Sequence, residues 1–95
     1  MVVGVGRLRL ALPGNSSLKG KRKVVRGVVT RVRSRFNVAV AEVDDMDVHE
    51  SAVLGFVAVG NDHRHVNSTL DKVMDFVEEL GLAPVEERGL EMIHC

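Results

Sequence analysis

Residues 17–36 read SLKGKRKVVRGVVTRVRSRF and form the most informative stretch of the chain. On a helical wheel of about 100° per residue, several of its apolar side chains fall within one narrow sector, which is typical of a helix packed on a sheet. These side chains are Leu18, Val25, Val29, Val32 and Phe36. Ser16 or Ser17 can cap the helix, because a serine hydroxyl accepts a hydrogen bond from a free N–H of the first turn. The stretch therefore predicts an amphipathic helix.

The same helix carries a strip of positive charge beside its apolar stripe. The stretch holds eight of the thirteen Lys and Arg residues and no carboxylate. Five of these cations are consecutive around the cylinder, with only Thr30 interposed: Arg22, Arg33, Arg26, Lys19 and Lys23. We call this set the basic flank. Because Lys and Arg side chains neutralise phosphates, the basic flank is the candidate nucleic-acid-binding site.

The formal net charge of zero hides an asymmetry between the two halves of the chain. Residues 1–41 contain ten Lys or Arg and no Asp or Glu, whereas residues 42–95 contain three and thirteen. Such a distribution indicates a basic surface available to polyanions. Alternatively, the two halves neutralise each other across the fold, and the sequence leaves both interpretations open.

Length and composition indicate one cytoplasmic domain. The chain has 95 residues, of which 45% are apolar, so a single modest core is expected. Cys95 is the sole cysteine and has no partner for a disulfide, which fits a reducing compartment. No cationic region followed by a long apolar core opens the chain, and no apolar run reaches ~18 residues. We therefore expect a cytoplasmic protein with no membrane partner.

The order of hydrophobic patterns predicts the fold. Strands are expected at residues 1–12, 38–43, 52–59 and 85–94. Asn61 or Asp62 is expected to cap a second helix that ends at Gly81. Its apolar stripe consists of Val66, Leu70, Val73, Val77 and Leu80. The order βαββαβ predicts a ferredoxin-like α+β fold, in which two helices cover one face of a four-stranded antiparallel sheet.

The other face of this sheet is expected to be apolar and uncovered. The third strand would present either Val53, Val57 and Val59 or the alternate set Ala52, Leu54, Phe56 and Ala58. An open patch of this kind is larger than soluble monomers usually tolerate. We therefore expect a homo-oligomer, most simply a dimer, that forms through the open face.

The candidate chemical motifs do not complete a site. Residues 14–22 (GNSSLKGKR) resemble a phosphate-binding loop, but the glycine spacing is wrong and Arg22 replaces the required Ser or Thr. The acidic residues 44–50 lack the glycine and glutamate positions of a calcium loop. His63 and His65 have no further ligands in zinc-site spacing, and nothing is assigned to His94 or Cys95. The sequence predicts no catalytic residue, no cofactor and no metal ion.

The first strand and three motifs that follow it in order resemble the YlxP-like family of small bacterial proteins of unknown function. The three motifs are P-G-x-x-S-L-K-x-K-R at residues 13–22 after the first strand, R-F-N-V-A-V-A-E-V at residues 35–43, and V-G-N-D at residues 59–62. Gly20 stands where an acidic or other helix-favouring residue is common in that family. The resemblance implies a ferredoxin-like fold and genes often found beside those for translation-initiation and ribosome-maturation factors. It implies no catalytic residues.

The basic flank leads to two functional hypotheses. The first is a nonenzymatic RNA- or ribosome-associated binding module. The alternative is an oligomeric structural or regulatory protein whose basic helix binds an acidic protein surface.

Overall fold

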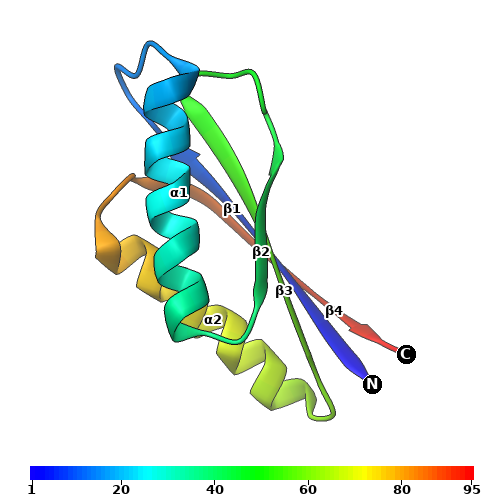
Figure 1. The fold of residues 1–95 in the computed structure, drawn as a ribbon. Helices are drawn as coiled ribbons and strands as arrows, with labels where there is room; N and C mark the ends of the chain where they lie inside the picture. The colour runs from blue at the N-terminus through cyan, green and yellow to red at the C-terminus, as the bar shows by residue number, and fades with distance from the viewer.

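The computed structural model describes residues 1–95 and contains four strands and two helices (Figure 1). Their bounds are β1 Val2–Ala11, α1 Leu18–Arg35, β2 Ala39–Asp44, β3 Ser51–Gly60, α2 His63–Leu80 and β4 Val85–His94. The four strands form one antiparallel sheet in the order β2-β3-β1-β4. This order and connectivity are those of a ferredoxin-like fold, so the predicted fold class is confirmed. The predicted element bounds differ by only one or two residues.

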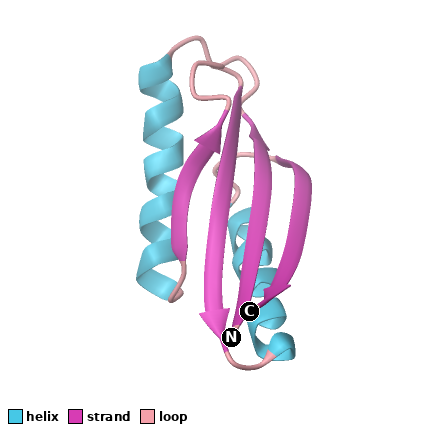
Figure 2. Ribbon diagram, turned by 90° about the vertical axis from the view of Figure 1, so that its right-hand side faces the viewer, coloured by secondary structure: helices cyan, strands magenta, loops and turns pink.

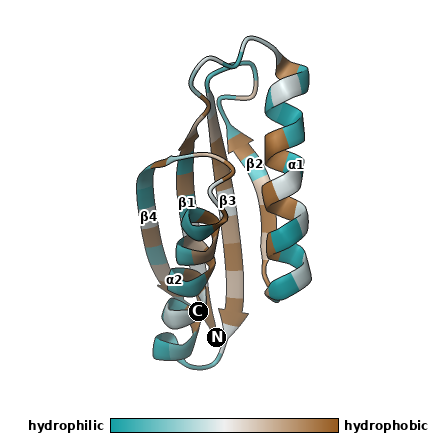
Figure 3. Ribbon diagram, turned by 90° about the vertical axis from the view of Figure 1, so that its left-hand side faces the viewer, coloured by the Kyte–Doolittle hydropathy of each residue, from teal (hydrophilic) through white to brown (hydrophobic).

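The two helices lie on the same side of the sheet but cover different parts of it. Helix α2 contacts β1 and β3 at the centre, whereas α1 contacts β2 and α2 (Figures 1 and 3). Serine and aspartate caps begin them: Ser17 Oγ accepts from Gly20 N at 3.0 Å, and Asp62 Oδ1 accepts from Arg64 N at 3.1 Å. Helix α2 ends at Gly81, whose φ of 65° lies in the left-handed region that favours glycine.

The buried face of α1 differs from the predicted apolar stripe. The helix buries Lys21, Val25, Val28 and Val32. Val29, which the wheel placed at the edge of the stripe, is only partly buried. The prediction of the helix phase was therefore wrong by about 40°. The error arose because the predicted stripe was defined by apolar residues alone, whereas the buried face of α1 includes Lys21.

The core lies between the helices and the sheet, and the alternation of β3 shows which strand residues contribute to it. Ala52, Leu54, Phe56 and Ala58 are buried on the helical side together with four members of the predicted α2 stripe: Val66, Leu70, Val73 and Val77. Met74 joins them, whereas Leu80, the last member of the predicted stripe, is only partly buried. Strand β3 is hydrophobic along most of its length (Figure 3). The helix-free face of the sheet is turned toward the viewer in Figure 2. Val57 and Val59 of the alternate β3 set are exposed, but Val53, which was expected to lie uncovered with them, is fully buried. The sheet therefore has one face without helices.

Candidate nucleic-acid interface

The structure places all five residues of the basic flank on the outer surface of α1. Four of them are exposed, and their side chains form no ion pair: Lys19, Arg22, Lys23 and Arg26. Arg33 is also exposed, but its guanidinium donates to the carbonyl oxygen of Val40 in β2 at 3.2 Å. The flank therefore consists of four free cations and a fifth that is tied to the edge of the sheet.

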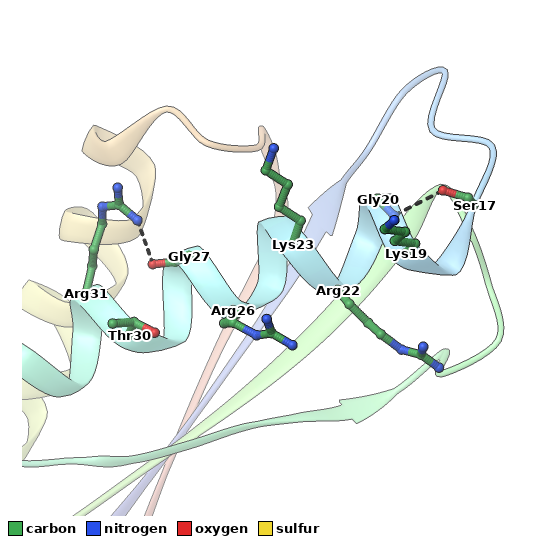
Figure 4. Close-up of a pocket in the computed structure, with 9 residues that line it drawn as sticks. All are labelled: Ser17, Lys19, Gly20, Arg22, Lys23, Arg26, Gly27, Thr30 and Arg31. Carbon is green, nitrogen blue, oxygen red and sulfur yellow. Dashed lines mark hydrogen bonds between the residues drawn. The ribbon is translucent and has the colours of Figure 1, made fainter.

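These cations surround a shallow hollow along the outer side of α1. The hollow has a volume of about 910 Å³, and no hydrophobic residue lines it. Arg22 and Arg26 extend to the same side of the helix, whereas Lys23 extends to the opposite side (Figure 4). Arg31 also borders the hollow, but it folds back and donates to the carbonyl oxygen of Gly27 at 3.0 Å. Because one helix supplies all the lining residues, the hollow is an open binding surface and not an enclosed cavity.

Other cations of the basic half are neutralised by carboxylates of the acidic half. Arg7 pairs with Asp44 at 3.0 Å, and Arg9 pairs with Asp45. The pKa of Asp44 is lowered, first because its side chain accepts a hydrogen bond from the backbone N–H of Asp45 and second because Arg7 donates to it. The hydrogen bond to Asp45 is the main reason that the pKa of Arg9 is raised. The two halves therefore neutralise each other at this end of the sheet, but not along the basic flank.

Lys21 is the one cation of α1 whose role the sequence did not reveal, since it is 1% exposed. Its Nζ donates to the backbone carbonyls of Asp45 and, at 2.8 Å, Val48. Glu42 Oε2 lies 2.9 Å from the same Nζ and has no hydrogen-bond partner, so this contact is an ion pair without hydrogen-bond geometry. We call Lys21 Nζ and these three oxygens the Lys21 cage. Because the cage satisfies the ammonium internally, Lys21 fixes the β2–β3 loop and does not contribute to the basic flank.

Gly20 and Asn15 connect the start of α1 to the same loop. Asn15 Nδ2 donates to the carbonyl oxygen of Ser17 at 2.8 Å and to that of His49 at 2.6 Å. A Cβ at position 20 would lie 2.4 Å from Asn15 Oδ1. Glycine at this position therefore leaves room for the Asn15 side chain, which holds the loop after β1 against the β2–β3 loop.

The histidines do not assemble a metal centre. His63 Nδ1 lies 2.9 Å from His94 Nε2, and the two rings are parallel, with an interplanar angle of 1°. His65 and Cys95 are exposed. No three His, Cys, Asp or Glu side chains come together in an arrangement that could hold a metal ion.

Neither helix of the structure is long and apolar enough to cross a membrane.

Comparisons with known proteins identify relatives of unknown function. The family model described as "Protein of unknown function (DUF503)" matches residues 3–88. The uncharacterized protein YlxP of Bacillus subtilis (strain 168) is 27% identical over 77 residues, which cover 81% of this chain and 84% of YlxP. The resemblance to YlxP-like proteins inferred from the sequence motifs is thereby confirmed.

The solved structure of Rv0793 supports the fold assignment. Rv0793 from Mycobacterium tuberculosis superposes with a TM-score of 0.50 at 12% identity, covering 100% of this chain and 95% of that one. SnoaB, a cofactor-independent oxygenase from Streptomyces nogalater, gives a TM-score of 0.43 at 11% identity, covering 99% and 91%. At these identities, the likeness extends to the fold and not to the chemistry.

Proposed function

Since this chain belongs to the DUF503 family of proteins of unknown function, we propose a function from its own side chains: it is a nonenzymatic module that binds RNA, including ribosomal RNA, through the basic flank. The observation that carries the proposal is that Lys19, Arg22, Lys23 and Arg26 are exposed on one helix with no carboxylate paired to them.

The spacing of the flank suits a phosphate backbone. Lys19 and Arg26 are seven residues apart, which corresponds to about 10 Å along a helix. Successive phosphates of a duplex strand rise about 3.4 Å each along its axis, so the flank spans about three such steps and can reach four phosphates. Cations at i, i+3 and i+4 also repel one another by a few tenths of a kcal/mol per pair. A polyanion would relieve this repulsion, which an ordinary surface helix avoids by mixing charges of both signs.

The lining of the hollow favours RNA over an acidic protein surface. Protein interfaces contain a buried core of apolar and aromatic anchors, which contribute most of the binding energy. The hollow on α1 has no hydrophobic lining residue. It also contains no carboxylate, histidine or cysteine that could act as an acid, a base or a nucleophile. The surface therefore supports binding of repeated phosphates.

The test is a salt-dependent titration of a ribosomal RNA fragment with the parent protein and two matched variants. Arg22→Ala/Arg26→Ala removes two cations that extend to the same side of the hollow. Arg64→Ala/Lys72→Ala removes the same charge from exposed positions on α2 that form no ion pair. Neither double variant touches a buried residue, so both should keep the fold.

If four phosphates are neutralised, the parent should lose about 100-fold in affinity between about 50 and 200 mM salt. The α1 variant should lose only about tenfold over the same range, because its slope is smaller by about 1.4–1.8 units. The α2 variant should behave like the parent. Equal affinity of the parent and the α1 variant, or no RNA binding by any of the three, would contradict the proposal. Tighter binding to polyglutamate than to RNA would favour the acidic protein surface.

A further inference from the structure

The open face of the sheet is divided into an apolar end and a polar end. The strand register aligns side chains of this face in rows across the strands. The apolar end consists of the row Val59, Val3 and Ile93 and the row Ala39, Val57, Val5 and Glu91. The next row consists of Ala41, Gly55, Arg7 and Gly89. The polar end begins with this row and continues with the paired side chains of Arg9, Asp45 and Glu87.

The apolar end combines protruding side chains with a hollow. Val59 is 66% exposed, and Ile93 is 42% exposed. A hollow of about 300 Å³ lies farther along the same face, and Gly55 is among the residues that line it. The Val43 side chain covers Gly55, since a Cβ built there would lie 2.9 Å from Val43 Cγ1. Gly89 provides the open gap, because a Cβ built there would find its nearest neighbours 4.0 Å away, in Arg7. Each of two strands thus carries a large side chain and, four residues away on the same face, a glycine: Val59 and Gly55 on β3, and Ile93 and Gly89 on β4.

We propose that a second copy of this chain packs on the open face, related by a two-fold axis that runs across the strands through the row of Val5 and Val57. This axis reverses the direction of the strands and keeps each strand opposite its own copy. The row of Val59 and Ile93 then faces the row of Gly55 and Gly89 in the second copy. Val59 lies over Gly55 and the Val43 side chain that covers it, and Ile93 enters the open gap at Gly89. Val5, Val57 and Glu91 lie against their own counterparts.

The charges of the face are compatible with a second copy. Arg7 and Arg9 are balanced by Asp44, Asp45 and Glu87, so two such faces do not repel each other strongly. Glu91 is the one charged side chain in the central row, so it faces its own copy across the axis. Both carboxylates lie on the exposed edge strand β4, where water weakens their repulsion. A polyanion would find no unpaired cation on this face.

The area of the face suits a modest dimer interface. Four strands about 4.8 Å apart and about 33 Å long give a face of roughly 600 Å². Two such faces together bury roughly 1,200 Å², the lower limit for a stable interface, so we expect a dissociation constant in the micromolar range. Aligned sheets pack about 10 Å apart, a separation that the valine side chains of both faces and Ile93 in the Gly89 gap can fill.

The experiment measures mass by light scattering or sedimentation from about 1 to about 200 μM protein, concentrations that bracket a micromolar dissociation constant. Val59→Lys places a charge in the interface. Gly89→Val fills the gap that receives Ile93, and its Cβ would lie no closer than 4.0 Å to its own chain. Leu82→Lys is the control, because Leu82 is 41% exposed in the segment between α2 and β4, away from the open face. Thermal unfolding of each variant checks that it remains folded.

We expect the parent and Leu82→Lys to form dimers and both Val59→Lys and Gly89→Val to remain monomers that are as stable as the isolated parent chain. Gly89→Val/Ile93→Ala exchanges the large and the small side chain, so it should recover the dimer. A parent that stays monomeric at about 200 μM would overturn the proposal, since an interface with micromolar affinity is almost fully formed at that concentration. A Gly89→Val variant that still forms dimers, or a double variant that does not recover them, would overturn the two-fold arrangement.

Discussion

Lys21→Met removes the only charged side chain that the fold buries. Methionine retains much of the apolar stem of lysine, so the substitution deletes the ammonium without opening a large cavity. The two carbonyls of Asp45 and Val48 lose their shared donor, and the Glu42 carboxylate, whose side chain is 15% exposed, loses its counter-ion. We expect the variant to be strongly destabilised.

The magnitude follows from the contacts of the Lys21 cage. Breaking a buried ion pair by removing one partner costs about 3–5 kcal/mol. We expect a cost at the lower end of this range because residues 46–48 are exposed, so the carbonyls of Asp45 and Val48 can bind water when the loop opens. A loss of about 3 kcal/mol is a large part of the roughly 5–14 kcal/mol expected for a domain of this length. It corresponds to a decrease in Tm of about 12–24 °C.

Urea and thermal unfolding of the parent, Lys21→Met, Glu42→Gln and the double variant provide the measurement. Glu42→Gln leaves the two carbonyl hydrogen bonds of Lys21 intact and should be the milder single change. The double variant should be less destabilised than the sum of the two singles by at least about 1 kcal/mol, because each single change leaves one charge without its partner. If Lys21→Met changes the free energy of unfolding by less than about 1 kcal/mol, the cage does not hold the loop as described.

Two further predictions concern the helix phase and the pH dependence. Val28→Asp should lower the free energy of unfolding by several kcal/mol, because it buries an unpaired carboxylate. Val29→Asp should lower it clearly less, since Val29 is only partly buried. Equal urea midpoints of the two variants would contradict the buried face described for α1. Asp44→Asn should lower Tm near neutral pH, and its Tm should converge with that of the parent below about pH 4. The pKa of Asp44 is lowered in the folded protein, so Asp44 stabilises the fold at pH values above its pKa in the unfolded chain. This stabilisation is lost as the pH falls through the pKa that Asp44 has in the folded protein. Tm curves of the parent and the variant that stay parallel would contradict this prediction.

The fold could be predicted from the sequence because its patterns are local. The alternation of β3 and the 3.6-residue period of α2 are contained in short windows, and Asp62 and Gly81 mark the ends of α2. The phase of α1 could not be predicted in this way. Its buried face includes Lys21, and a buried lysine is explained only by partners elsewhere in the chain.

The candidate site was predictable to the extent that it depends on one helix. The wheel placed four cations together on the outside of α1, where the structure also has them. It could not show that Arg33 would reach the carbonyl of Val40, nor that Arg7 and Arg9 would be neutralised while the flank remained free. These pairings depend on strand register and on the β2–β3 loop, which helical periodicity does not specify.

The Lys21 cage has an evolutionary consequence. It joins the first turns of α1 to the end of β2 and the loop that follows β2, although Lys21 lies more than 20 positions before Glu42 in the chain. A descendant that loses the lysine keeps a buried acid at the position of Glu42, so selection should replace both residues together or retain both. Substitutions at the two positions should therefore be correlated among relatives, and an alignment of enough of them would reveal the contact between α1 and β2 without any structure.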